Sequence, residues 1–291
     1  MDSKNVGFIG AGNMSSALIK GIIQRGVCKP TNIFVSSPSG PGLHLQNLGV
    51  NCTKDNKFVF ESSDVIVLAV KPFKIYEALQ TLSGSTPRKE CILISVASGV
   101  SLDLIQNMIT NLNLQTNGNP LPAIFRVMPN TPAQVLVGAS GMCTFSTVDE
   151  TKRALVRELF EAVGKVQAVE EKHMDAVCGL SGSGPAFVML FIEALADGAV
   201  ASGLPRPAAM SLALQLVKGA ATMAQETGLH PGVLKDAVAS PGGTTIAGIH
   251  ALEVGGFRGS VMSAVINASK RSAELGEIED KKVGALLGLK K

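Results

Sequence analysis

The chain opens with a strand-like run, a glycine-rich turn and a helical pattern in immediate succession. Residues 6–9 form a short apolar run, and the turn Gly10 to Ser15 leads into a helical segment that ends near Arg25. The turn follows the pattern G-x-G-x-x-S, in which a small Ser15 replaces the usual final Gly or Ala. This pattern between a strand and a helix is typical of a turn that binds a dinucleotide. A tight turn that serves only packing is the alternative interpretation. The order of strand, turn and helix favours a domain built from alternating strands and helices.

Further short apolar runs follow in the first half of the chain, at residues 32–35, 64–70, 91–96 and 124–127. They are rich in Val and Ile and lack polar alternation, which is typical of parallel strands covered on both faces. Two more strands are expected near 141–145 and 166–169, with a helix over 149–163 between them. The polar segment 111–122 is expected to be a surface loop. This half therefore predicts an α/β fold with a doubly wound parallel sheet.

The strand signal stops after Glu170, and the second half predicts helices over 186–202, 207–227, 245–254 and 259–275. Glycines and prolines between these segments are expected to end or begin helices; they are Gly203, Pro205, Gly228, Pro231, Gly255 and Gly276. We predict a domain boundary near Val169, with a nucleotide-binding domain over 1–169 and an all-α domain over 170–291. The helix from Ala186 is apolar almost all round, so burial on every side is expected.

Composition points to a self-associating protein. Apolar residues make up 46% of the 291 residues and charged residues only 17%, so we expect apolar surface to be buried between subunits of a homodimer. The net charge is +3 and the sequence has no basic run, so nucleic acid is not expected as a partner. The longest apolar stretch, 186–195, contains Glu193 and falls short of the ~20 residues of a membrane span. No membrane partner is therefore expected.

The five cysteines are scattered, odd in number and without a C-x-x-C pair, which favours a reducing compartment and a role as small core residues. The first strand begins at about Val6, so no removable signal is expected before it. A cytoplasmic location follows as the expectation, while an organelle signal overlapping the first strand stays an open alternative. His44, His173, His230 and His250 lack metal-ligand spacing, and no metal is expected.

Ligands of open parallel sheets lie outside the carboxyl ends of the strands. At the end of the second strand an NAD site would offer an acid, whereas this chain has Ser36, Ser37 and Pro38. Nothing there repels a 2′-phosphate, so NADP is favoured and NADH remains possible, although no Arg is present as a clamp. Lys71 after the third strand is either a phosphate contact or a solvated charge. The segment 126–132, with Asn130, either lines the nicotinamide end or forms a rigid turn.

The stretch Ser240 to Thr245, SPGGTT, leads straight into a second helical run far from the first glycine loop. A proline, two glycines and two hydroxyls ahead of a helix leave backbone N–H groups free to hold an anion. Two such helix starts, one in each half of the chain, suggest a dinucleotide at one and a small acid at the other.

With these two loops, the segment FRVMPNTP and the stretch Gly179 to Pro185 (GLSGSGP), the chain resembles pyrroline-5-carboxylate reductases over essentially its whole length. The resemblance implies NAD(P)H-dependent reduction of 1-pyrroline-5-carboxylate to L-proline, the last step of proline biosynthesis. It also implies an N-terminal Rossmann domain and a helical C-terminal domain that forms intertwined dimers, which often gather into decamers.

The resemblance also implies the site residues. The SPGGTT loop would take the substrate carboxylate on backbone N–H groups, with Thr245 reaching the ring nitrogen as the catalytic residue; a helix N-cap is the alternative role of Thr245. The substrate-binding residues would be Ser240, Gly242, Gly243, Thr244 and Thr245. The cofactor-binding residues would be Ile9, Gly10, Ala11, Gly12, Asn13, Met14, Ser37, Pro38, Asn56, Ala69, Val70, Lys71, Pro72, Ala97 and Ser98.

The residue chemistry agrees, because hydride addition to a protonated cyclic imine yields an amine and needs no strong acid–base side chain. Oxidation of a 3-hydroxy acid is the second enzyme hypothesis, but enzymes of that kind generally offer a lysine after the glycine-rich linker, and residues 179–197 contain none. A catalytically silent NADP-binding or proline-sensing protein is the third hypothesis. The intact glycine loops and Thr245 count against it.

Overall fold

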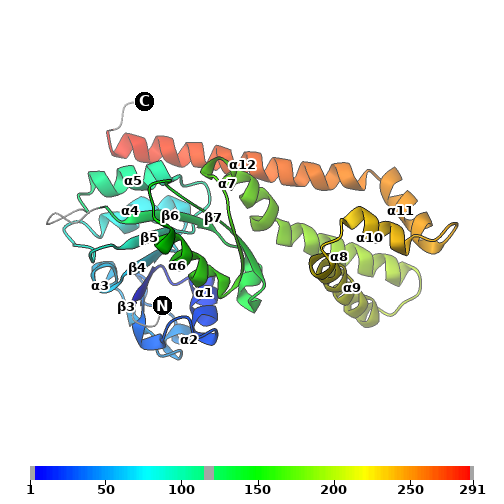
Figure 1. The fold of residues 1–291 in the computed structure, drawn as a ribbon, viewed down its shortest axis with the longest axis horizontal. Helices are drawn as coiled ribbons and strands as arrows, with labels where there is room; N and C mark the ends of the chain where they lie inside the picture. Colours follow the sequence, from blue (N-terminus) through cyan, green and yellow to red (C-terminus); the bar gives the residue numbers. More distant parts are fainter. Residues whose placement is uncertain (1–3, 115–120, 289–291) are drawn as a thin grey trace. The chain divides into compact units, whose positions relative to one another are not determined.

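The computed structural model describes residues 4–114 and 121–288, so part of the loop expected over 111–122 lies outside the described residues. Two compact units make up the chain (Figure 1). The first, which we call the nucleotide unit, comprises Met1–Ser183 with Asn267–Lys291, and the second, the helical unit, comprises Gly184–Ile266. The boundary between the two compact units thus falls after Ser183. The boundary expected near Val169 lies at the end of the last strand.

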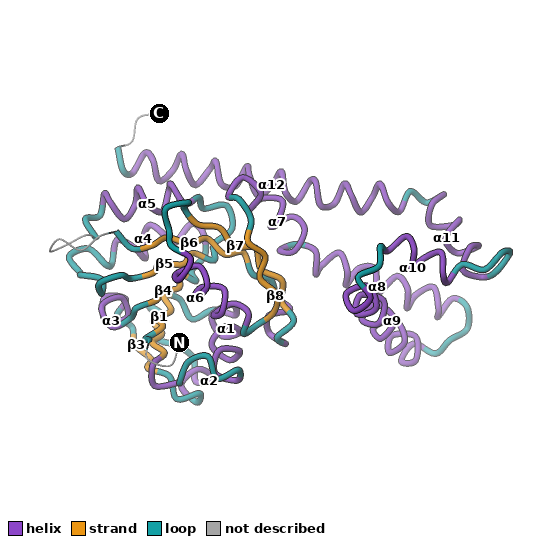
Figure 2. Tube along the Cα trace, viewed as in Figure 1, coloured by secondary structure: helices purple, strands orange, loops and turns teal. Residues whose placement is uncertain are grey.

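The nucleotide unit is built on one sheet of eight strands in the order β3-β2-β1-β4-β5-β6-β7-β8 (Figure 2). The strand order reverses between β1 and β4, which is the switch point at which doubly wound sheets bind ligands. The predicted α/β sheet is confirmed. Its strands are β1 Val6–Ile9, β2 Ile33–Ser36, β3 Asn51–Thr53, β4 Val65–Leu68, β5 Ile92–Ser95, β6 Ala123–Met128, β7 Gly138–Thr144 and β8 Gly164–Ala168.

Two features of the sheet differ from the expected one. Strand β7 runs antiparallel to β6, because only the short turn Thr131–Val135 joins them and a parallel neighbour would need a much longer crossover. Strand β3 was not expected; it is three residues long and has no apolar run. It pairs in parallel with β2, and Thr53 lies beside Ser36.

Helices cover both faces of this sheet. Alternate residues of β4 face opposite layers: Val65 and Val67 pack with residues of α1 and α6, and Ile66 and Leu68 pack with residues of α3, α4 and α5. All four are fully buried, as the unbroken apolar runs predicted. The helices of this unit are α1 Asn13–Gln24, α2 Leu43–Gln46, α3 Asn56–Ser62, α4 Ile75–Gln80, α5 Leu102–Asn111, α6 Glu150–Glu161 and α7 Met174–Val177.

The helical unit buries little of its own surface. Its core consists of Ile192, Ala196, Ala209 and Ala213, where α8 and α9 pack together. Helix α8, expected to be buried on every side, exposes Val188, Met189 and Leu190 in this chain, so that expectation is not met by the chain's own packing. The helices are α8 Gly184–Ala201, α9 Arg206–Thr227, α10 Pro231–Val238, α11 Thr244–Val254 and the start of α12 Phe257–Leu286.

One helical run, Glu171–Ala201, is long and apolar enough to cross a membrane when judged by length and composition alone. It includes α7, the π-helical turn Cys178–Gly182 and α8. Little of its most apolar window is buried within the chain. The expectation that the protein has no membrane partner stays a prediction.

Helix α12 continues well past the point where the sequence predicted its end. Gly276 was expected to stop a helix at Leu275, but the helix runs to Leu286. That expectation was wrong, because the following residues are mostly strong helix formers and one interior glycine costs only about 1 kcal/mol. The far end of α12 also packs on the nucleotide unit, where Ser272 and Val283 are buried.

Candidate functional site

The turn between β1 and α1 has the geometry of a phosphate cradle. Gly10 has φ of +106°, which favours glycine, and a Cβ built on it would lie 2.6 Å from the carbonyl oxygen of Ala69 at the end of β4. Its N–H donates to the Ser36 carbonyl oxygen at 2.9 Å. Gly12 is the N-cap of α1, and a Cβ there would meet no atom within 4 Å. Backbone can therefore approach an anion at the helix start.

A hydrogen bond made by Ser15 explains why the motif ends in a serine. Its side chain is fully buried, and its hydroxyl donates to the carbonyl oxygen of Gly10 at 2.6 Å. This bond ties the first turn of α1 back to the loop that precedes it. The substitution thus satisfies a carbonyl that a Gly or Ala at this position would leave to another partner.

The end of β2 carries hydroxyls and no acid. The buried Ser36 hydroxyl donates to Asn56 Oδ1 at 2.6 Å, and Asn56 Nδ2 donates to Thr81 Oγ1 at 2.9 Å. The side chain of Asn56 is therefore held within the protein, and its predicted cofactor contact stays a prediction. Ser37 is half-buried and Pro38 exposed, at the place predicted for the adenosine phosphate.

A cation that the sequence analysis missed lies at this same place. Lys54 follows β3, and a Cβ built on Gly40 would lie 3.5 Å from Lys54 Cε, so the side chain runs beside the turn that begins at Ser37. The neighbouring carboxylate of Asp55 accepts N–H bonds from Lys57 and Phe58 as the N-cap of α3. The sequence carries no apolar run at β3 that would have placed Lys54 here.

The loops after β4 and β5 complete the switch-point edge. Ala69 N–H donates to the Ile9 carbonyl oxygen at 2.9 Å, and Lys71 is exposed. The side chain of Ala97 is buried in the core, which leaves only its backbone for a ligand. Ser98 is half-buried, with its hydroxyl 3.2 Å from the Cys178 thiol. The predicted cofactor residues after β1, β2, β4 and β5 thus gather at one edge of the sheet.

The Asn130 side chain joins three parts of the nucleotide unit. This buried amide donates from Nδ2 to the Ser181 carbonyl oxygen at 3.0 Å and accepts the Ala139 N–H at Oδ1 at 2.9 Å. It therefore links the loop after β6 to the π-helical turn and to β7. Its polar atoms position these segments, and its predicted contact with the nicotinamide end stays a prediction.

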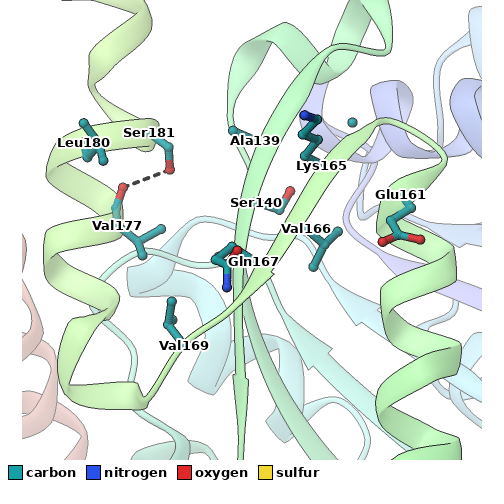
Figure 3. Close-up of a pocket in the computed structure, with 12 residues that line it drawn as sticks. Ala139, Ser140, Glu161, Lys165, Val166, Gln167, Val169, Val177, Leu180 and Ser181 are labelled. Carbon is teal, nitrogen blue, oxygen red and sulfur yellow. Dashed lines mark hydrogen bonds between the residues drawn. The ribbon is translucent and has the colours of Figure 1, made fainter. Parts of the chain in front are cut away.

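A cavity of about 770 Å³ opens between β8 and the π-helical turn (Figure 3). Residues of β7, β8, α6 and α7 line it, among them Lys165, Gln167 and Val177. The dashed line in Figure 3 marks the Ser181 hydroxyl donating to the Val177 carbonyl oxygen at 3.0 Å. None of the predicted cofactor or substrate residues lines this cavity.

The SPGGTT loop of the helical unit is a tight turn that ends at a helix start. Gly243 N–H donates to the Ser240 carbonyl oxygen at 3.1 Å, and Gly242 has φ of +66°. A Cβ on Gly243 would overlap the Ser240 hydroxyl. The positive φ thus favours glycine at position 242, and a side chain at position 243 would require the Ser240 hydroxyl to move.

Thr245 is not a helix N-cap, so the alternative interpretation of this residue is wrong. Helix α11 begins at Thr244, and its N-cap is Gly243, which supplies no side-chain cap. The first bond to the cap carbonyl oxygen is donated by Ala247 at 3.3 Å. The backbone N–H groups of residues 244–246 precede that bond and point out of the helix start, where they suit a carboxylate.

Other reactive side chains have structural roles. Burial raises the pKa of the Cys143 thiol to about 12 and also raises the pKa of Cys91, so both remain protonated at neutral pH. His230 caps α10 by accepting the Gly232 N–H at Nδ1, 3.1 Å away, as expected for a helix-start residue. Among residues 4–114 and 121–288, no three His, Cys, Asp or Glu side chains gather as metal ligands.

Comparison with protein families matches the two parts of the chain separately. Residues 171–275 match the family described as pyrroline-5-carboxylate reductase dimerisation. Residues 5–99 match the family described as NADP oxidoreductase, coenzyme F420-dependent. The second match covers β1 to β5 and hence the predicted cofactor loops after β1, β2, β4 and β5.

Full-length relatives agree. The pyrroline-5-carboxylate reductase of Arabidopsis thaliana is 46% identical, over 95% of this chain and 97% of its own length. A solved structure of the Coxiella burnetii enzyme of that name has a TM-score of 0.83 at 36% identity, covering 94% of this chain and 99% of its own. A Plasmodium falciparum pyrroline carboxylate reductase with NADP bound has a TM-score of 0.81 at 33% identity, covering 95% and 99%. The chain therefore belongs to the pyrroline-5-carboxylate reductase family.

Proposed function

We propose that this protein catalyses the NAD(P)H-dependent reduction of 1-pyrroline-5-carboxylate to L-proline, the last step of proline biosynthesis. The observation that carries the proposal is the pairing of two anion-binding helix starts in one chain, at Gly12 for a dinucleotide and at Gly243 for a small acid. Family membership supports the same reaction.

The chain's own groups bind and orient the substrate. NADPH supplies the hydride when bound, and the hydride adds to the imine carbon while the C=N electron pair moves to nitrogen. Because the nitrogen is already protonated, the product is a secondary amine and no side chain needs to donate a proton in this step. The first N–H groups of α11 hold the carboxylate, and the Thr245 hydroxyl accepts the N–H of the protonated imine.

The protein uses NADP(H), in line with the NADP-bound relative and the NADP oxidoreductase match. NADPH is at least as good a donor as NADH, because residues 36–39 offer hydroxyls and no carboxylate where a 2′-phosphate would lie. Lys54 adds a positive charge beside that turn.

The dimerisation match supports oligomerisation. We propose a homodimer built through the exposed apolar helices of the helical unit, assembling into a decamer as the family resemblance implies. The five cysteines are scattered along the sequence and form no C-x-x-C pair, which supports the further proposal of a cytoplasmic location.

The direct test follows NADPH absorbance while 1-pyrroline-5-carboxylate is added to purified protein, with proline measured as the product. We expect stoichiometric NADPH oxidation and proline formation, and a kcat/KM with NADPH equal to or above that with NADH. Absence of proline formation with either donor would refute the proposed reaction. A much higher kcat/KM with NADH would refute only the cofactor preference.

A further inference from the structure

Gly276 of α12 lies in direct backbone contact with the loop that follows β5. A Cβ built on Gly276 would lie 2.7 Å from the Gly99 carbonyl oxygen, and one built on Gly99 would lie 3.1 Å from the Gly276 nitrogen. Contacts under 3.0 Å require something to shift, and here both partners are backbone. Gly99 also has φ of +76°, which favours glycine. The two segments can approach this closely only because neither carries a side chain.

The loop held by this contact borders the proposed cofactor surface. Gly99 directly follows Ala97 and Ser98, which lie between the pyrophosphate turn after β1 and the loop after β6. The other side of the loop is fixed as well. Ser98 contacts Cys178 of the π-helical turn, and Leu102 N–H donates to Glu171 Oε1 at 2.6 Å.

Helix α12 cannot easily yield at this point. Four residues before Gly276, the buried Ser272 hydroxyl donates to Asp175 Oδ1 at 2.7 Å, and Val283 is buried in the core further along the helix. Because the helix is anchored on both sides of Gly276, a side chain added there would push against the loop.

We propose that Gly276 is a positioning residue for hydride transfer, setting the place of the Ala97–Ser98 loop against the nicotinamide part of NADPH. The proposal rests on the proposed function of the protein. It extends the cofactor site to a residue of the C-terminal helix, remote in sequence from the nucleotide motifs. A misplacement of reacting groups by about 1 Å is enough to cost roughly 100-fold in rate.

The test compares Gly276→Ala with Gly284→Ala, a control on the same helix where an added Cβ meets no atom within 4 Å. Alanine favours the helix at both positions, so Gly284→Ala should keep wild-type kinetics and melt no earlier. We expect Gly276→Ala to lose roughly 10-fold to 100-fold in kcat/KM. Its primary isotope effect with 4-deuterated NADPH should rise as hydride transfer becomes rate-limiting, and its Kd for NADPH, followed by fluorescence, should increase.

The NADPH titration separates this proposal from the proposed reaction. If the wild type forms no proline, the reaction is refuted, whereas the Kd comparison still tests the contact. Wild-type kcat/KM, isotope effect and Kd in a folded Gly276→Ala protein would overturn the positioning role. If Gly276→Ala fails to fold, Ser272→Ala removes the bond to Asp175 that anchors the same part of α12. We expect a smaller change in kcat/KM, isotope effect and Kd, and no change in them would also overturn the proposal.

Discussion

The nucleotide unit and the helical unit solve the problem of holding a ligand loop in different ways. In the nucleotide unit the Gly10 turn is backed by Ala69, bonded to Ser36 and closed by Ser15, all within one densely packed chain. In the helical unit the turn after Ser240 is closed by the backbone bond from Gly243 to Ser240, and the core of the unit consists of four buried residues. The first site is shaped by its own chain, whereas the second lies in a unit with a small core, and we expect association to support it.

The strongest way to break this comparison is to place a charge on the apolar surface of the helical unit. Leu190 on α8 is 69% exposed in the chain, and Leu43 on α2 of the nucleotide unit is 73% exposed. We expect Leu190→Glu to abolish assembly and activity, because a buried unpaired charge is costly at an interface. Leu43→Glu should leave the oligomer intact. Light scattering measures the particle mass of both variants, and NADPH oxidation measures their activity. A wild-type particle near 30.1 kDa would contradict the proposed dimer.

A second experiment asks whether the Gly10 turn depends on its packing. Gly10→Ala puts a Cβ against Ala69 in a left-handed conformation, so we expect NADPH binding to weaken by about 100-fold. Gly26, at φ of +67° with no atom within 4 Å of an added Cβ, is the matched control. Gly26→Ala should lose roughly 1 kcal/mol of stability and keep its NADPH Kd. Equal Kd values for the two variants would remove the role assigned to the Ala69 contact.

A third experiment sharpens the comparison in the helical unit. Since Gly243 caps α11, Thr245→Ala removes no helix cap, and we expect an unchanged melting temperature. Its kcat/KM for 1-pyrroline-5-carboxylate should fall by roughly 10-fold to 100-fold, with NADPH affinity unchanged. Thr222→Ala, on the surface of α9, serves as the control. A folded Thr245→Ala enzyme with wild-type kcat/KM would show that Thr245 has no catalytic role.

The sequence predicted correctly those elements whose structure follows from the pattern of apolar residues within the element itself. The strands β1, β2, β4, β5 and β6 are such elements, because continuous Val and Ile runs have to be covered on both faces. Strand β3 was missed because its three residues carry no such run, and Lys54 was missed with it. Helix α10 was also missed, although it starts at Pro231, because it spans only eight residues.

The remaining errors came from residues whose role depends on distant neighbours. Gly276 has the local signature of a helix end, and only the approach of Gly99, remote in sequence, explains why glycine stands inside a helix. A related case is Asn130, for which the sequence left a ligand contact and a rigid turn open: its amide bonds to Ser181 and Ala139, and its contact with the nicotinamide end stays a prediction. Local pattern carries no information about such pairings.

The nucleotide unit is discontinuous along the chain, and this matters for how the protein is made. Its last segment, residues 267–291, emerges from the ribosome after the whole helical unit has been synthesised. Domains generally fold as units in the order of their synthesis, at roughly 5–20 residues per second. The Rossmann sheet can therefore collapse early, but the loop that contains Gly99 reaches its final contacts only after α12 has been synthesised. A nascent chain can expose its association surface before its cofactor site has reached its final geometry.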